Sequence, residues 1–272
     1  MRKPIAVLGQ SLLAFALLIM GPAAHAQSSE GTRFEGNYSI RARGIDNVGR
    51  FSLNVHFLGD NYAANATRRV TNGLARTFLR NSQDYNYSVR GTRVGAVLRP
   101  SAYEHSGGRR GRIVRAAFSA TDVVTTGIPN APSMGNPECT PGQSCYAATP
   151  AQRRGVIDQV SAMAAMMITP NDPCARTLPV YMDGRSRFDF VLRPNGTQRV
   201  DIAGHRGDAI RCAVTFRPIA GFSDPQEEEQ LTFLFARQPN GMFVPLRLEM
   251  PTDDGLVVLQ ARNFTLTGPR PN

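Results

Sequence analysis

The sequence predicts an all-β fold: one large antiparallel sheet, curved, spirally wrapped or barrel-like, with one central helix. Apolar side chains recur at every second position along much of the chain, which is typical of strands with one buried and one solvated face. Turn-forming pairs such as Asp183-Gly184 and Asn195-Gly196 separate these runs. Many short strands with polar turns favour a sandwich, a barrel or a wrapped sheet, and we expect about eleven to thirteen strands.

The alternating runs lie in both halves of the chain. The clearest are residues 38–43, 51–57, 187–193, 210–217 and 244–250. Pro245 falls at an outward position of the last run, which predicts an edge strand or an irregular pairing there. A short helical turn is expected at residues 73–79.

Two segments in the middle of the chain break the alternation. Prolines and glycines crowd residues 129–150, which predicts a loop between two β halves. Residues 151–168 then carry apolar side chains at helical spacing, between Pro150 and Pro170. We expect this helix to pack as core across the open face of the sheet. The alternative is a lid over a cavity for an apolar ligand, because methionine adapts to irregular surfaces.

The first 26 residues have the features of a cleavable signal peptide. Arg2 and Lys3 precede an apolar run, and Ala24-His25-Ala26 places small residues where a signal peptidase cuts. We expect cleavage between Ala26 and Gln27, export to the periplasm, and a single mature domain at residues 27–272. The apolar run is short for a membrane span, and no later segment is apolar enough to cross a bilayer.

The chain is strongly basic. It has 31 basic and 21 acidic residues, a net charge of +10, and loss of Arg2 and Lys3 would leave +8. Lys3 is the only lysine. Arginine suits phosphate and carboxylate groups, and a cationic surface attracts anionic lipid or polymer, but compositional bias explains the preference for arginine more simply. Export and the lack of a nucleic-acid-binding motif argue against a nucleic-acid partner.

Four cysteines in an exported chain indicate disulfides. Three pairings are open, and we favour Cys139–Cys145 within the proline-rich loop and Cys174–Cys212 between two strands. A zinc site is the rival interpretation, but it lacks C-x-x-C spacing and nearby histidines.

No motif in the sequence identifies a catalytic, metal or cofactor site, and we expect none. The histidines that remain after cleavage, His56, His105 and His205, have no second histidine or carboxylate at metal-ligand spacing. Nucleophile elbows, P-loops and dinucleotide fingerprints are absent. Residues 107–112 combine glycines and arginines as an anion site does, but a solvated hairpin tip is the simpler interpretation.

The second half of the chain carries a more specific pattern. It consists of Cys174, Leu178-Pro179-Val180, Asp183-Gly184-Arg185, Phe188-Asp189-Phe190, Arg211-Cys212-Ala213-Val214, Arg217 to Phe222 and Val244 to Thr252. The chain resembles the bacterial exported family catalogued as domain of unknown function 3108. The resemblance implies a periplasmic protein with a barrel-like or spirally wrapped β fold and implies no reaction. Cys174 and Cys212 match the cysteine-bearing strands of the family.

We therefore expect a non-enzymatic periplasmic protein that supports the cell envelope by binding a lipid, an envelope polymer or an envelope protein, through an apolar or anionic ligand. One alternative is an envelope hydrolase whose site is assembled from residues distant in sequence, such as a histidine beside a carboxylate or serine. The other is an outer-membrane β-barrel, which the alternation permits. The absence of tryptophan and the polar end at residues 268–272 argue against it.

Overall fold

The computed structural model describes residues 31–71, 83–108, 111–127, 139, 142–252 and 255–271. The expected signal peptide with its cleavage site at Ala26 and Gln27, the helical turn at 73–79 and much of the 129–150 loop lie outside these residues. The described strands are β1 (Thr32–Ala42), β2 (Ile45–Leu58), β3 (Asn61–Val70), β4 (Tyr85–Val94), β5 (Val97–Gly107), β6 (Arg112–Phe118), β7 (Val123–Thr126), β8 (Arg176–Met182), β9 (Ser186–Ile202), β10 (His205–Ala220), β11 (Glu229–Arg237), β12 (Phe243–Thr252) and β13 (Gly255–Thr267).

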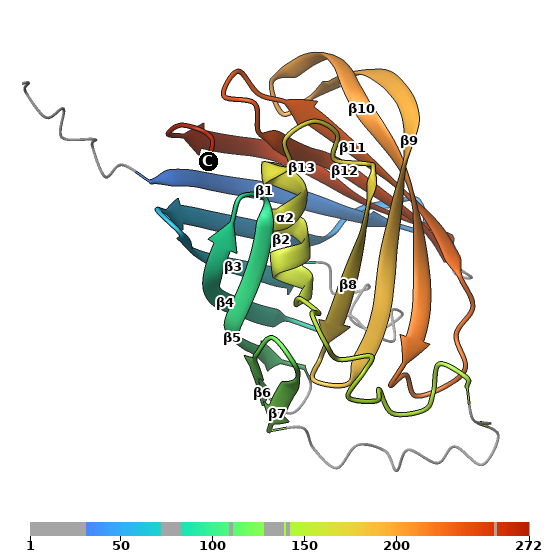
Figure 1. Ribbon diagram of the computed structural model, residues 1–272. Coiled ribbons are helices and arrows are strands. Elements are labelled where there is room, and N and C mark those ends of the chain that lie inside the picture. Colours follow the sequence, from blue (N-terminus) through green and yellow to red (C-terminus); the bar gives the residue numbers. More distant parts are fainter. Residues whose placement is uncertain are drawn as a thin grey trace, which may run out of the picture.

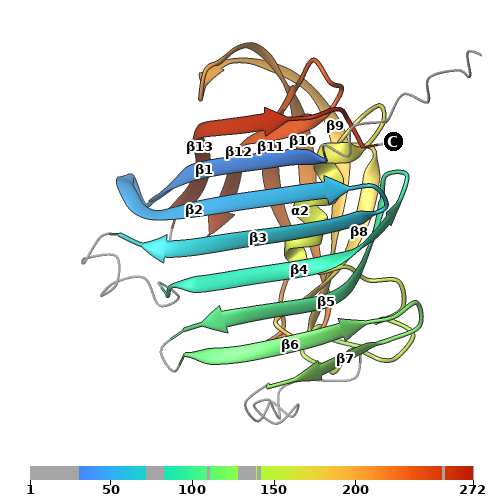
Figure 2. The ribbon, with the colours of Figure 1, turned by 90° about the vertical axis from the view of Figure 1, so that its left-hand side faces the viewer.

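All of these strands belong to one antiparallel sheet, so the fold class expected from the sequence is confirmed. The order is β7-β6-β5-β4-β3-β2-β1-β13-β12-β11-β10-β9-β8. The first half (β1–β7) and the second half (β8–β13) are therefore two meanders, joined where the first and last strands pair. The sheet curves strongly but does not close, and its two edges are β7 and β8 (Figures 1 and 2).

One described helix, α2 (Gln159–Ile168), lies inside the curve of the sheet and contacts β3, β4, β5, β8 and β12 (Figure 1). Its Met166, Met167 and Ile168 are fully buried, together with Phe235 and Leu246 of the sheet. Alternation explains this packing: in strands such as β1 and β3 the buried inward positions are mostly apolar, whereas the outward positions are mostly polar. The helix thus fills the concave side of the sheet as core.

The helix is shorter than the expected 151–168. Gly155 adopts a positive φ of 67°, which ends the turns that follow Pro150. Ile157 then forms a parallel bridge with Val180 of β8, through hydrogen bonds that hold its backbone extended. The helix begins only after Asp158, whose carboxylate accepts hydrogen bonds from the backbone N–H groups of the first turn. Pairing with a strand distant in sequence therefore overrides the local helix signals.

Two disulfides and one β-bulge are further features of the fold. Disulfides join Cys174 to Cys212 and Cys139 to Cys145, with Cα atoms 5.2 and 6.1 Å apart, and these are the pairs favoured from the sequence. Pro245 lies in an internal strand, where the β11–β12 register shifts. The β12–β13 pairs begin only at Arg247, so the missing N–H group of Pro245 removes no hydrogen bond from that ladder.

Candidate functional site

The structure keeps the three histidines apart. His56 lies on the outer face of β2, and His205 begins β10 at the tip of the long β9–β10 hairpin. His105 points inward from β5, where its Nδ1 atom is 3.3 Å from the Tyr103 hydroxyl and 3.7 Å from an Asp183 carboxylate oxygen. Burial lowers the pKa of His105, and the negative charge of Asp183 opposes this shift.

A second polar cluster surrounds the start of α2. The Asp158 carboxylate accepts hydrogen bonds from two backbone N–H groups and from the Ser161 hydroxyl, which is 2.7 Å from the Tyr62 hydroxyl. The Gln159 amide donates to Tyr103 at 2.6 Å, which joins this cluster to His105. Asp158 and Ser161 are fully buried, and burial raises the pKa of Asp158. The cluster fixes the helix against the sheet and presents no hydroxyl to a substrate.

An open groove of about 560 Å³ crosses the outer face of β4, β5, β6 and β7. Strand register places its side chains in two parallel rows, because directly paired residues on one face are neighbours. The first row is Ser88, Glu104, Arg115 and Thr126, and the second is Arg90, Ala102, Ala117 and Val124. The two alanines form a low floor between taller side chains at either side.

Charge is distributed unevenly along this groove. The Arg115 guanidinium donates to Glu104 at 2.8 Å, and the two side chains are 61% and 42% exposed. Arg90 is exposed as well, and within the described part of the chain no carboxylate pairs with its guanidinium. Val124 at the far end of the second row is 63% exposed. The groove therefore offers one uncompensated positive charge, a charged hydrogen-bonding pair, two hydroxyls and an apolar end.

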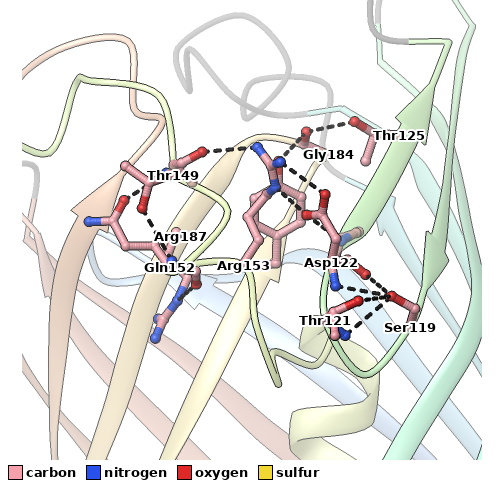
Figure 3. Close-up of polar contacts among 12 residues, drawn as sticks. Ser119, Thr121, Asp122, Thr125, Thr149, Gln152, Arg153, Gly184 and Arg187 are labelled. Atoms are coloured by element: carbon pink, nitrogen blue, oxygen red, sulfur yellow. Dashed lines mark hydrogen bonds and ion pairs between the residues drawn. The ribbon is translucent and has the colours of Figure 1, made fainter.

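A polar clasp, made of Asp122, Thr125, Arg153 and Gly184, holds the wall of the groove in place (Figure 3). Arg153 donates to both carboxylate oxygens of Asp122, at 2.7 and 3.2 Å. The Thr125 hydroxyl donates to the carbonyl oxygen of Gly184 at 3.2 Å. Side chains thus join the β7 edge to the second half of the sheet across a seam that no strand ladder closes. The hydrogen bonds from Arg153 are the main cause of a lowered pKa for Asp122.

The glycine–arginine segment considered from the sequence ends β5 and begins β6. Gly107 and Gly108 lie against the ring of Tyr85, and Arg112 is exposed at the start of β6. Arg109 and Arg110 lie outside the described residues. Sequence patterns do not predict the groove, because its rows depend on the register of four strands. The small residues at outward positions, Ala102 and Ala117, were its only local signal.

Neither a metal-binding cluster nor a membrane-spanning helix is present in the described ranges. No group of three or more His, Cys, Asp or Glu side chains in them is arranged to hold a metal ion. None of the helices in the same part of the chain is long and apolar enough to cross a membrane.

Comparisons with known proteins give one family. The family model described as "Protein of unknown function (DUF3108)" matches residues 37–262. No curated protein matches the sequence. Among solved structures, the chain is similar to a β-barrel-like protein of domain of unknown function DUF1849 from Brucella abortus, with 10% identity, a TM-score of 0.47 and coverage of 88% of this chain and 98% of that chain. A DUF1329 family protein from Desulfovibrio piger is 12% identical, with a TM-score of 0.31 and coverage of 88% and 86%.

Proposed function

This chain belongs to the DUF3108 family of proteins of unknown function, and we propose that it is a non-enzymatic periplasmic protein that binds an anionic envelope polymer in the groove over β4–β7. One observation carries the proposal: the exposed Arg90 guanidinium lies beside an alanine floor, and none of the carboxylates that the structure describes pairs with it. An arginine fork in that position suits a carboxylate or phosphate group of a ligand.

The shape of the groove favours a polymer over a lipid. An extended chain can lie across an open groove, with its hydroxyl groups bonded to Ser88, Thr126 and the Arg115–Glu104 pair. An acyl chain needs an enclosed apolar space, whereas Met166 and Met167 of α2 pack as core on the concave side. A partner protein of the envelope is a weaker candidate, because it would have to fill a groove floored by two small side chains.

Export to the periplasm is supported by the disulfides and by the character of residues 1–26. Two disulfides in one domain are typical of proteins that fold in an oxidising compartment. The charged start, apolar run and Ala-His-Ala site provide the route to that compartment.

The two alternatives rest on weaker observations. The hydrolase gains support from His105, which lies beside the carboxylate of Asp183. Its Nδ1 atom faces a tyrosine and not a serine, however, and the residue is only 6% exposed. The outer-membrane alternative requires an apolar outward band, whereas β1 and β3 carry outward Glu35, Asn37 and Asn65.

Calorimetric titration of the exported protein with oligogalacturonate, an anionic glycan, tests the proposal against neutral dextran as the matched probe. We expect binding to the anionic probe only. Arg90→Ala should weaken binding by about 10- to 100-fold, because a hydrogen bond to a charged group contributes about 1.5–3 kcal/mol. Arg50→Ala removes an exposed arginine of the outer face beyond the groove and should change little.

Two results would contradict the proposal: equal binding of both glycans, or wild-type affinity in Arg90→Ala. Mass spectrometry of the titrated oligogalacturonate adds a test of the hydrolase alternative. A non-enzymatic protein leaves the chain length of the probe unchanged, whereas shortened products would favour the hydrolase.

A further inference from the structure

We propose that the protein also docks on an anionic phospholipid bilayer, through an apolar prong made of Leu58, Val94 and Val97. These side chains are 46%, 61% and 56% exposed. They flank two hairpin turns, β2–β3 and β4–β5, which lie at the same end of the sheet (Figure 2). This surface is separate from the groove, so the inference goes beyond the proposed polymer binding.

The two turns are braced into one rigid unit. Arg93 is 7% exposed, and its guanidinium donates to the carbonyl oxygens of Gly59 and Gly95, one in each turn, at 3.0 and 3.4 Å. Its backbone N–H also donates to the carbonyl oxygen of Asp60 at 2.8 Å. Both glycines adopt positive φ values, which lets the chain reverse in two residues. The prong therefore meets a surface without first losing conformational entropy.

The charges around the prong complement an anionic surface. Arg33 and Arg99 lie on the same outer face, each two residues along the sheet from the apolar tips by register, and both are exposed. Asp60 is the one carboxylate within the two turns. Apolar side chains flanked by arginines are the combination that binds the headgroup region of anionic membranes.

A bilayer fits this surface better than a second protein does. A stable protein interface buries about 800 Å² on each partner, and three aliphatic side chains on two turns provide far less. A bilayer needs no complementary shape, since isolated apolar tips enter the headgroup region individually. A second copy of this chain remains a distinct outcome that the experiment below identifies.

Vesicle sedimentation tests the inference on the exported protein, after its N-terminus has been established by mass spectrometry. We expect binding to vesicles of mixed phosphatidylglycerol and phosphatidylcholine, and weaker binding to phosphatidylcholine alone. Replacing Leu58, Val94 and Val97 together by serine should lower the partition coefficient by about tenfold or more. These positions are exposed, so folding is preserved. The matched control replaces Ile45, Ile113 and Leu256, which are 43–48% exposed at the other end of the sheet, and should bind as wild type does.

A fluorescent label supplies a second readout. All four cysteines are in disulfides, so Val94→Cys introduces a single reactive thiol. The emission of a polarity-sensitive dye at this position should shift to the blue when anionic vesicles are added.

Three sedimentation results would each overturn the inference: no binding by the wild type, equal binding by the prong variant, or an equal loss of binding in the control variant. A concentration-dependent dimer that the prong substitutions abolish would also overturn it, by assigning the prong to a second copy. Arg90→Ala should leave vesicle binding intact, which separates this test from that of the groove.

Discussion

Removal of the Asp158 side chain should destabilise the fold more than its position outside the sheet suggests. The carboxylate caps α2 through two backbone N–H groups and accepts the hydroxyl of Ser161. Loss of an N-cap costs about 0.5–2 kcal/mol, and a buried hydroxyl without its acceptor costs about 1–3 kcal/mol. Asp158→Ala should therefore lower the free energy of unfolding by roughly 2–4 kcal/mol. Asp158→Asn keeps an oxygen at the cap and should cost less than about 1 kcal/mol.

The Asp158 carboxylate should also make the stability of the fold depend on pH in a defined direction. Burial raises the pKa of Asp158 in the folded state above its unfolded value of about 3.9. The folded protein then holds this proton more tightly. The stability of wild type relative to Asp158→Asn should be greatest below about pH 4 and fall as pH rises through the folded-state pKa.

Urea unfolding followed by circular dichroism at several pH values measures both effects. Equal stability of Asp158→Ala and Asp158→Asn would refute the capping argument. A difference between wild type and Asp158→Asn that grows with pH would refute the assigned direction of the pKa shift.

Two further predictions concern the links across the sheet. Replacing Cys174 and Cys212 by alanine should lower the free energy of unfolding by about 4 kcal/mol, on the loop-entropy model for a separation of 38 residues. Non-reducing peptide mapping of the wild-type protein should recover the Cys174–Cys212 pair, whereas free thiols at both positions would exclude it. The hydrogen bonds from Arg153 hold the pKa of Asp122 low, so their contribution to stability is present above about pH 3.9 and is lost as pH falls through the lower folded-state pKa. Acid titration should therefore narrow the stability difference between wild type and Asp122→Asn, and a difference that stays constant would contradict the pairing.

Local patterns predicted the strands because alternation and turn chemistry are properties of neighbouring residues. Phe34 and Tyr38 point inward for the same reason that Arg33 and Glu35 point outward. Pro245 was also located correctly as a site of irregular pairing, although its strand is internal. The helix start was wrong by eight residues, because Ile157 pairs with β8, which lies later in the sequence.

The candidate site could not be predicted in the same way. Arg90, Ala102 and Ala117 become neighbours only through the register of three strands, and a one-residue slip would move each to the other face. The pairing of His105 with Asp183 likewise depends on the curvature that brings the two halves of the sheet together. Neither relation can be established from a single segment of the chain.

Hydrogen–deuterium exchange with and without oligogalacturonate tests the central claim most directly. Strand β7 lies at a sheet edge and forms one wall of the groove, so its amides should exchange faster than those of the internal strands. The account predicts that the glycan slows exchange in β4–β7 and leaves the β9–β10 hairpin unchanged. Protection confined to the second half, or no protection at a glycan concentration that saturates calorimetric binding, would contradict a binding site in the groove.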